Sequence, residues 1–541
     1  MHAISIAGRH TRLDSRLFAM LIAAALLIPT LTSPAADAQA PGPGDADREL
    51  YGPVLAAQQD AVYAETEGML SRFRIDAIFT PRTKSELAHI DGSVQLRFVN
   101  ITPDALSELY LRLYPNADEY ADGGMTLADI SSDGSELDVR LSEADTLATV
   151  TLPQSLPSGA ALDLSLDFTS TIPTDPAGSY GMYSYDVQSG SYALAHWLPL
   201  LAGFDPATGW ELGPPSEYGD PVFTNTALFD VSITSPTDFV LVTTGSEVES
   251  APNGDLMTHR FVSGPVRDFV MALDADFQVE SLTVGETVVN SYFNPDSAET
   301  GLEVLTAGAQ SLEVYNRLAG DYPYAEMDLV QIDLGNGAGG VEFPQLMFIG
   351  GDYYGPSETL TLIPGYLEFV VAHEVAHQWW YGLVGNNQYR HAFIDEGMAN
   401  YLTIVYFEQI YGEEAANQQI NYNLKASYFA RLFKDGDQIV DQPTDDFPSQ
   451  RAYGSIVYGK AALGFGEVRD TIGDDAFFDG LRAYVSEFRF GIAEPQDLKE
   501  AFETASDTDL DELWRHWFEA AEGGQDFDAA DLANLLREIG R

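Results

Sequence analysis

Hydrophobic and polar residues alternate along much of the chain between residues 70 and 275. In residues 94–98 an apolar Val, Leu and Phe are separated by Gln and Arg, and the same period of two recurs in residues 109–113 and 231–234. Turn-forming pairs separate such runs: Asp91-Gly92, Asp133-Gly134 and Asn253-Gly254. A period of two is typical of half-buried strands. The pattern therefore predicts an all-β domain over residues 70–275.

The pattern changes after residue 276, where long amphipathic runs become frequent. A strand is expected at 328–332, followed by a glycine-rich run at 335–340. Helices are expected at these ranges: 298–319, 365–383, 395–412, 414–433, 458–472 and 474–488. The predicted fold is thus an N-terminal all-β domain followed by an α/β, mostly helical domain over residues 276–541.

The first residues have the composition of an export signal. Arginines in residues 9–16 precede an apolar run at 17–28, and Ala36-Asp37-Ala38 fits a signal-peptidase site. An uncleaved anchor is the alternative, but the apolar run is short for crossing a bilayer. We expect a signal peptide at 1–38, a linker or N-terminal extension at 39–69, and export to the periplasm or outside the cell.

Charge and cysteine content exclude several classes of protein. The 541 residues carry a formal net charge of −56, which disfavours nucleic acid and anionic lipid as partners. The acidic residues are spread along the chain and keep an exported protein soluble; adaptation to high salt is a further hypothesis. Because there is no cysteine, disulfides, cysteine nucleophiles and thiolate metal sites are excluded.

One motif indicates a metal site. Residues 373–377 read His-Glu-Val-Ala-His in a segment expected to be helical, so His373 and His377 lie one turn apart on one face. Glu374 lies beside that face, where a base acting on water is needed. A catalytic zinc needs a third protein ligand, and Glu396 at the start of the next helix is the candidate. With nine histidines in the chain a chance motif is the alternative, but the helical context and Glu396 favour metal binding.

This stretch, HEVAHQWWYGLVGNNQYRHAFIDEGMANY, resembles the gluzincin metallopeptidases of the aminopeptidase N family, in which eighteen residues separate HExxH from the ligand glutamate. Residues 339–343 resemble the family's G-x-M-E-N motif, and residues 456–460 the segment with its catalytic tyrosine. Residues 229–245 and 265–277 resemble its N-terminal saddle domain. The resemblance covers about residues 70–520 and implies a β-saddle domain followed by a thermolysin-like domain.

The resemblance implies a role for each matching residue. One zinc ion would be held by His373, His377 and Glu396, with Glu374 as the catalytic base. Tyr458 would stabilise the negative charge on the substrate carbonyl oxygen. Substrate binding falls to Glu342, which would pair with the free α-amine, and to Gly339 and Gly340, which allow close backbone approach. The expected partners are peptides.

Some positions depart from the family pattern. Val341 and Phe343 replace its Met and Asn, and no second amine anchor is evident in the β domain, although residues 191–199 are a candidate stretch. The large C-terminal helical domain of many relatives is also expected to be missing. Two readings compete with an aminopeptidase: a zinc endopeptidase or epoxide hydrolase of the same family, and a catalytically silent binding scaffold. Trp379, Trp380, His196 and His391 are expected to be structural.

Overall fold

The computed structural model describes residues 45–120, 122–174, 182–216, 218–335, 338–356, 360 and 362–540. The predicted signal peptide, residues 1–38, and the first residues of the predicted linker lie outside the described residues. Residues Ala46–Arg541 form one compact unit. The domain boundary between residues 275 and 276 therefore stays a prediction.

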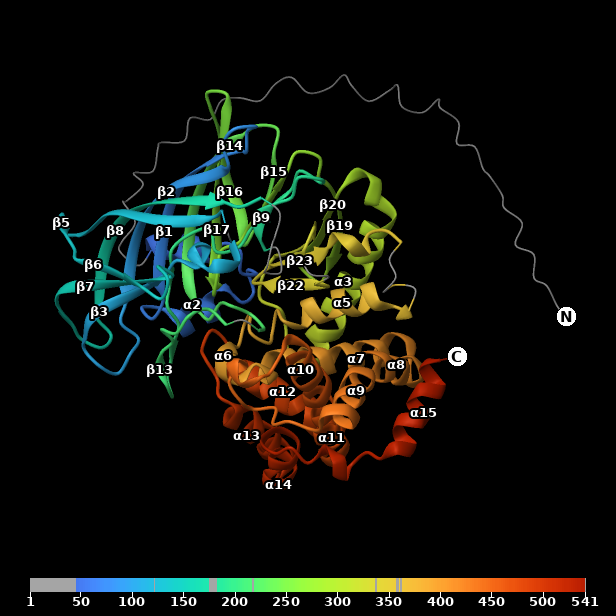
Figure 1. The fold of residues 1–541 in the computed structure, drawn as a ribbon. Coiled ribbons are helices and arrows are strands. Elements are labelled where there is room, and N and C mark those ends of the chain that lie inside the picture. The colour runs from blue at the N-terminus through green and yellow to red at the C-terminus, as the bar shows by residue number, and fades with distance from the viewer. Residues whose placement is uncertain are drawn as a thin grey trace, which may run out of the picture. The chain divides into compact units, whose positions relative to one another are not determined.

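An eight-stranded sheet forms the N-terminal half (Figure 1). Its order is β16 (Ser246–Asn253), β17 (Leu256–Val266), β14 (Ala227–Pro236), β1 (Ser71–Thr80), β2 (Ala88–Val99), β8 (Ala161–Ile172), β4 (Gly124–Ser132) and β5 (Ser135–Glu136). Along β2, Val94, Leu96 and Phe98 are at most 2% exposed. The predicted alternation of apolar and polar residues thus reflects side chains that point in turn to the buried and the exposed face of the sheet.

Three smaller sheets also belong to this half. One contains β15 (Val240–Thr243), β18 (Met271–Asp274), β10 (Tyr192–Leu194) and β9 (Tyr183–Tyr185). Another contains β11 (Leu200–Leu201), β3 (Leu106–Arg112), β7 (Leu147–Leu156) and β6 (Val139–Ser142); the hairpin β12 (Phe204–Asp205) and β13 (Gly209–Trp210) completes the set. Aromatic rings pack between the sheets, as in the edge-to-face pair of Phe79 in β1 and Tyr192 in β10, whose centroids are 4.9 Å apart.

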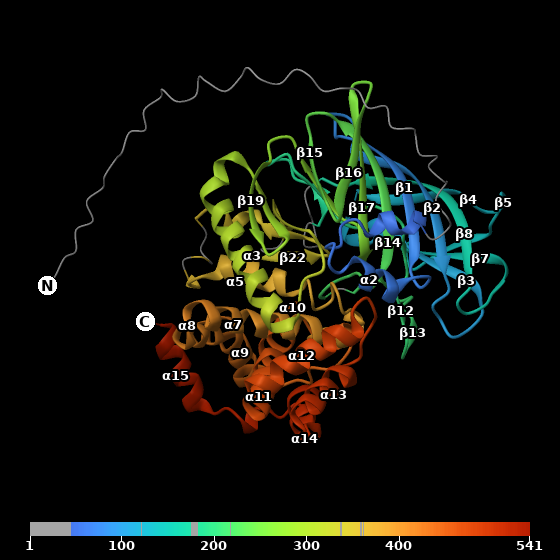
Figure 2. The ribbon, with the colours of Figure 1, turned by 180° about the vertical axis from the view of Figure 1, so that it is seen from behind.

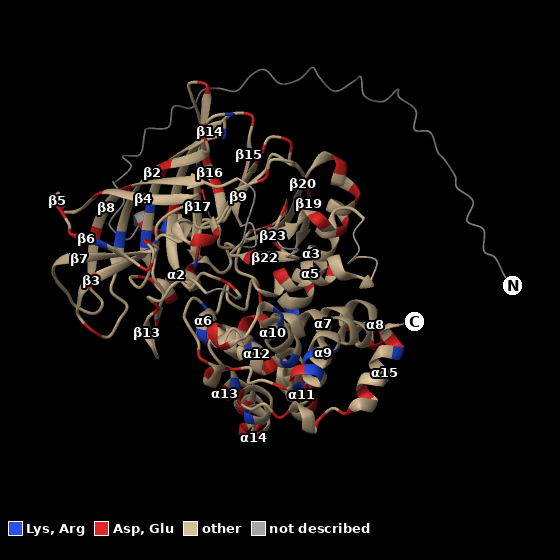
Figure 3. Ribbon diagram, viewed as in Figure 1, with Lys and Arg blue, Asp and Glu red and all other residues tan. Residues whose placement is uncertain are grey.

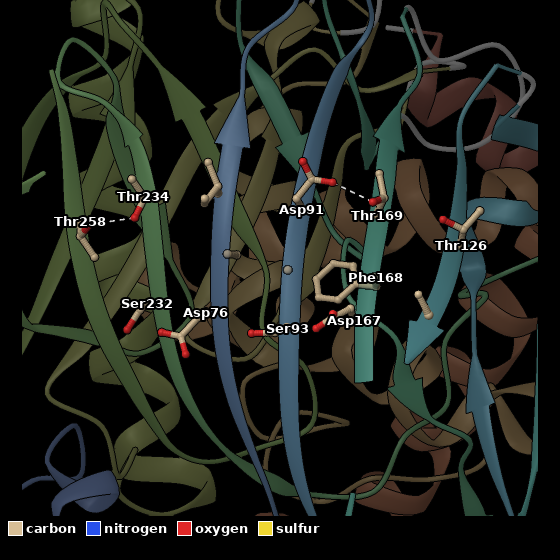
Figure 4. Close-up of a pocket in the computed structure, with 14 residues that line it drawn as sticks. Asp76, Asp91, Ser93, Thr126, Asp167, Phe168, Thr169, Ser232, Thr234 and Thr258 are labelled. Atoms are coloured by element: carbon tan, nitrogen blue, oxygen red, sulfur yellow. Dashed lines mark hydrogen bonds between the residues drawn. The ribbon is translucent and has the colours of Figure 1, made fainter. Parts of the chain in front are cut away.

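One turn prediction is wrong. Asp133-Gly134 joins β4 to β5 and Asn253-Gly254 joins β16 to β17, as expected, but Asp91-Gly92 lies within β2. Gly92 stands opposite Phe168 of β8, and a Cβ at this glycine would lie 2.4 Å from the phenylalanine ring. The glycine is therefore needed for ring packing rather than for a turn. Figure 4 shows this part of the sheet. The hydroxyl of Thr169, on the neighbouring strand, donates a hydrogen bond to Asp91.

The described part of residues 39–69 is not a linker. It contains the helices α1 (Asp45–Arg48) and α2 (Gln59–Thr66), and Leu50, Tyr51 and Val62 are at most 2% exposed. The backbone of Leu55 donates to the carbonyl of Pro323, far along the chain. The segment is therefore an extension whose apolar residues pack against the rest of the fold.

The second half begins with a five-stranded mixed sheet. Its order is β19 (Gln278–Val284), β20 (Thr287–Phe293), β21 (Glu326–Ile332), β23 (Leu346–Gly350) and β22 (Gly340–Phe343). The helices α3 (Ala298–Ala319) and α5 (Tyr366–Ala376) pack beside it, as Figure 2 shows from behind. The hydroxyl of Tyr315 in α3 donates to the carbonyl of Ala372 in α5 at 3.0 Å, which fixes the two helices together.

Helices make up most of the remaining chain and lie together in both views (Figures 1 and 2). They are α6 (Gln388–His391), η7 (Phe393–Gly397), α7 (Met398–Tyr411), α8 (Glu413–Gln419), η8 (Ile420–Lys425), α9 (Ala426–Asp435), α10 (Gln450–Tyr453), η10 (Gly454–Lys460), α11 (Ala461–Ile472), α12 (Asp474–Phe488), α13 (Pro495–Ser506), α14 (Asp511–Trp514), η11 (Arg515–Glu519) and α15 (Ala529–Ile539). All six predicted helical ranges contain helices. The helix expected at 365–383 ends early, at Ala376. π-helical turns overlap the ranges 395–412, 414–433 and 458–472, at η7, η8 and η10, whereas the helices expected at 298–319 and 474–488 are continuous.

Acidic residues are distributed over both halves, as Figure 3 shows, and few segments carry lysine or arginine. None of the described helices is both long and apolar enough to cross a bilayer.

Candidate metal centre

The helix α5 carries the first two candidate ligands. It starts after Gly365, which has a φ of +74°, and almost all its residues are buried. His373 and His377 lie four residues apart near its end, and their Nε2 atoms are 3.1 Å from each other. The hydrogen bond between Nδ1 of His377 and the carbonyl of Trp380, at 3.1 Å, leaves the Nε2 lone pair of His377 available for a metal.

Glu396 completes a triangle with these imidazoles. It stands on the π-helical turn η7, and its Oε2 lies 3.2 Å from Nε2 of His373 and 3.2 Å from Nε2 of His377. Three ligands about 2.1 Å from one tetrahedral ion stand about 3.4 Å apart, so the observed triangle fits one small divalent ion. All three residues are at least nine-tenths buried.

Glu374 projects into the same cavity from the next position of α5. It is 4% exposed, and its Oε2 has no hydrogen-bond partner among the described residues. Its carboxylate lies over Gly340, where a Cβ would approach its Oε1 to 2.5 Å. Gly339 is similarly close to Val370 of the helix. The two glycines therefore allow β22 to run directly beside the metal-ligand helix, while their predicted role in substrate binding stays a prediction.

Tyr458 faces the candidate metal ligands from the opposite side. It belongs to the π-helical turn η10, and its hydroxyl donates to Oε1 of Glu396. Its ring centroid lies 5.8 Å from that of His373. The structure thus places a phenol next to the candidate carboxylate ligand.

Glu342 stands on β22, the edge strand of the five-stranded sheet, and points to the same cavity. Its Oε1 lies 3.7 Å from Nδ1 of His377. The alternating neighbours Val341 and Phe343 are buried, and the Phe343 ring packs against Phe348 with centroids 5.2 Å apart. Phe343 therefore serves the core and offers no polar group to a substrate.

Gln378 holds this strand in register with the helix. Its Nε2 donates to the carbonyl of Phe343 at 3.0 Å, and its Oε1 accepts from the backbone of Gln345 at 2.8 Å. Trp379 and Trp380 are both fully buried, in agreement with a packing role.

Asp220 is a residue of the cavity that the sequence reasoning missed. It follows β13 in the N-terminal half and lines the same cavity of about 220 Å³ as Glu342 and Glu374. Gln388 donates from Nε2 both to Asp220 at 3.1 Å and to Asp395 at 2.9 Å, which fixes both carboxylates. None of the residues in 191–199, the stretch considered for a second amine anchor, lines this cavity. A lone aspartate in a loop has no periodic or motif signal, so only the fold reveals it.

The cavity is electrostatically unbalanced. Burial raises the pKa of Glu342 to about 7, and the nearby carboxylate of Glu396 adds to the effect. Burial and the charge of Glu342 raise the pKa of both Glu374 and Asp220 well above the usual range. Several buried carboxylates thus compete for protons in one cavity, and positive charge from a ligand would stabilise their ionised forms.

The two other singled-out histidines are not metal-ligand candidates. His391 pairs through Nδ1 with Asp441 at 2.6 Å, in the C-terminal half. His196 is 1% exposed, its ring lies 5.0 Å from that of Tyr114, and neither ring nitrogen has a partner among the described residues.

Comparison with known proteins agrees with this geometry. Residues 304–517, which contain all the candidate metal ligands, match the peptidase family M1 domain. The resemblance to the gluzincin aminopeptidase N family is thereby confirmed.

Curated relatives of the M1 domain are aminopeptidases of greater length. Aminopeptidase M1-B of Oryza sativa subsp. japonica is 22% identical over 385 residues, which are 69% of this chain and 42% of that protein. Aminopeptidase N of Lactobacillus delbrueckii subsp. lactis is 28% identical over 166 residues, which are 30% of this chain and 20% of that protein. The chain spans less than half the length of these relatives.

Solved structures confirm the fold class. An M1 zinc metallopeptidase from Deinococcus radiodurans is 18% identical, with a TM-score of 0.58, and covers 84% of this chain and 93% of its own. A mutant of a two-domain M1 zinc metallopeptidase bound to L-arginine gives a TM-score of 0.60 at 18% identity, over 84% of this chain and 94% of its own. At this identity the likeness concerns the fold, which is a β-rich N-terminal part followed by a largely helical part.

Proposed function

We propose that this chain is a zinc metallopeptidase that releases N-terminal residues from peptides. The observation that carries the proposal is that three metal-ligand atoms meet, and that two of their residues line one cavity together with a base and two further carboxylates. His373, His377 and Glu396 would hold a single Zn²⁺, whose ligand preferences match two imidazoles and one carboxylate.

When bound, zinc supplies Lewis-acid chemistry and lowers the pKa of water to about 7. Glu374 is placed to take a proton from the attacking water, because its free Oε2 lies in the cavity beside the imidazoles. The hydroxyl of Tyr458 donates to the negative charge that develops on the peptide carbonyl oxygen. The phenol can leave Glu396 for this purpose by a small side-chain rotation.

Glu342 and Asp220 form the proposed site for the substrate's α-ammonium group. They reach the cavity from different halves of the fold, and the charge of Glu342 raises the cost of ionising Asp220. An ammonium group between them would relieve that repulsion and form charge-assisted hydrogen bonds with both. Because β22 is an edge strand, the peptide can extend from this point by adding along it.

We further propose that the protein is exported, to the periplasm or the cell exterior, after cleavage behind Ala38. The composition of residues 1–38 supports this, and the acidic, cysteine-free chain is consistent with an oxidising compartment in which no disulfide is needed. Peptides are the proposed substrates.

The decisive test compares a short peptide with its N-acetylated form. Acetylation removes the positive charge that Glu342 and Asp220 would bind, so we expect kcat/KM to fall about 10²-fold or more. Cleavage of both at equal rates would favour a zinc endopeptidase and would remove the amine site. Absence of zinc in the purified protein together with absence of hydrolysis would favour the silent scaffold, and an epoxide hydrolase would turn over an epoxide but neither peptide.

A further inference from the structure

A second cavity, of about 580 Å³, is lined mainly by residues of the N-terminal half. Its walls are mainly apolar and come from β1, β2, β11 and β14, with rings such as Phe73, Phe98 and Phe229. Met69 and Ile101, which are 58% and 46% exposed, also line it and mark where it opens to solvent. The size falls within the range of small-molecule sites, and the open apolar entrance can admit a hydrocarbon chain.

A buried guanidinium group lines the same cavity. Arg267 is 1% exposed, and its hydrogen bonds go to the carbonyls of Thr224, Tyr381, Leu383 and Gly491. No carboxylate of the described residues forms an ion pair with it. Burial lowers the pKa of Arg267 to about 10, so it is still charged at neutral pH. A fully buried arginine is normally paired with an anion, because carbonyl dipoles satisfy its donors without neutralising its charge.

One N–H group of the guanidinium takes part in none of these hydrogen bonds. Of its five N–H groups, the hydrogen bonds above use one from Nε, one from Nη1 and two from Nη2, which leaves the second N–H of Nη1. Thr226 provides a second polar group on the cavity wall. It is 7% exposed, and its hydroxyl has no hydrogen-bond partner among the described residues.

We propose that this cavity binds a small amphipathic anion: a hydrocarbon chain among the aromatic rings, with a carboxylate that meets Arg267 and Thr226. The charge complementarity decides for an anion, since the mainly apolar walls present a cation that has carbonyls and the Tyr381 ring, but no carboxylate of the described residues, as neighbours, together with an unpartnered hydroxyl. The apolar walls decide for an alkyl or aromatic body over a free inorganic ion. Such a ligand would bind despite the overall charge of −56, because the interaction is local and buried.

The site is also connected to the metal-ligand helix. Arg267 holds the carbonyls of Tyr381 and Leu383, which directly follow the metal-ligand helix, and the carbonyl of Gly491 in the C-terminal half. Loop residues Phe490 and Ile492 line the cavity itself. A bound anion would therefore stabilise the junction where three parts of the fold meet.

Calorimetric titration with decanoate tests the proposal, and the full chain with its metal is used. We expect one decanoate per chain, with an affinity at least about tenfold higher than that of 1-decanol, because only the carboxylate can pair with the guanidinium. Decylammonium should bind more weakly than either. Equal affinities for decanoate and decanol, or no binding of decanoate up to about 1 mM, would overturn the proposal. The head-group comparison replaces a substitution at Arg267, since removing that side chain would also release three loops.

Two variants locate the site. Thr226→Val keeps the shape and removes the hydroxyl, and we expect it to weaken decanoate about tenfold while leaving decanol unchanged. Ile101→Glu places a negative charge at the entrance and should weaken decanoate at least about fivefold. Ile78→Glu is the matched control: Ile78 is an equally exposed isoleucine, at 50%, on the outer face of the large sheet. Loss of binding in the control but not in Ile101→Glu would place the ligand elsewhere and refute the site.

Discussion

Two buried, charged regions of the second half differ in how their charges are balanced. Four carboxylates line the cavity at the candidate metal centre, and neither lysine nor arginine is among the residues lining it. Around Lys460 the opposite holds. Its ammonium group is fully buried and donates to Asp437 at 2.8 Å and to the carbonyls of Gln438 and Ala520, so that each of its three donors is satisfied.

The difference distinguishes a region suited to binding ligands from a region that stabilises the fold. Asp437 also accepts from the hydroxyl of Tyr428 and from the backbone of Gly523, so the Lys460 cluster is complete without a ligand. The carboxylates of the cavity have no lysine or arginine partner among the described residues that line it, and the proposed metal ion and substrate ammonium group would supply the missing positive charge. Buried groups that the fold leaves unbalanced therefore indicate where ligands bind, and balanced ones indicate where the fold is held together.

The largest expected effect is on turnover in Glu374→Gln. The substitution removes the proposed base but also one of the mutually repelling charges, so kcat should fall by about 10³-fold or more while the melting temperature stays the same or rises. Bound zinc, measured by elemental analysis, should remain at the wild-type level. Glu368→Gln on the same helix is the control, because Glu368 accepts hydrogen bonds from Tyr406 and Tyr411 on the far side. Wild-type turnover in Glu374→Gln would refute the base assignment.

Lys460→Met tests the balanced region. Breaking a buried ion pair leaves Asp437 charged and only partly satisfied, so we expect the free energy of unfolding to fall by about 3–5 kcal/mol. Lys434→Met is the matched control: this lysine is exposed, with Asp435 3.8 Å away, and should change stability by less than about 0.5 kcal/mol. Denaturant titration measures both. If the two variants lose equal stability, the Lys460 cluster is not a structural centre.

Tyr458→Phe sharpens the functional side of the comparison. The phenol is proposed to act on charge that exists only in the transition state, so kcat should fall about 10²-fold with a much smaller change in KM. Steady-state kinetics with an aminoacyl reporter substrate measures both constants. Tyr453→Phe removes the hydroxyl of the neighbouring ring, 5.8 Å away, from a residue that does not line the cavity. A rise in KM at constant kcat would make Tyr458 a binding residue instead.

The candidate metal ligands could be predicted because helix geometry fixes them locally. A spacing of four residues brings His373 and His377 to one face whatever the rest of the fold does. The period of two in the N-terminal half is equally local, and it placed the buried residues of β2 correctly. Glu396 was predicted because a catalytic zinc needs a third protein ligand and a carboxylate begins the next helix. The proposed roles of Glu342 and Tyr458 came from the family resemblance, since nothing in their spacing specifies a common cavity.

Other features depend on contacts between distant segments and could not be predicted. Asp220 reaches the cavity from a loop in the other half of the fold, more than a hundred residues before the metal-ligand motif. Gly92 looked like a turn residue, but the ring of Phe168 determines its role. The π-helical turn η7, which brings Glu396 to the imidazoles, has no sequence period of its own. Such features become visible only when the tertiary contacts are known.

The smallest expected effect concerns His196, which is buried, neutral and without a hydrogen-bond partner among the described residues. Burial lowers the pKa of His196 to about 3, compared with about 6.5 when unfolded, so the unfolded chain takes up a proton that the folded chain refuses. The stability contributed by this residue is therefore complete above pH 6.5 and is lost as the pH falls towards 3. Between pH 7 and pH 5 the loss amounts to about 2 kcal/mol.

His196→Asn isolates this contribution. Because His196 has a φ of +59°, asparagine is the replacement that tolerates its backbone best. The variant should be less stable than the wild-type protein at pH 7, owing to lost packing against Tyr114, yet should lose about 2 kcal/mol less between pH 7 and pH 5 in urea titrations. Protonation of the metal ligands affects both proteins alike and cancels in the difference. Parallel profiles of unfolding free energy against pH for the two proteins would contradict this prediction. They would mean that His196 becomes protonated within the fold, next to a group that stabilises its charge.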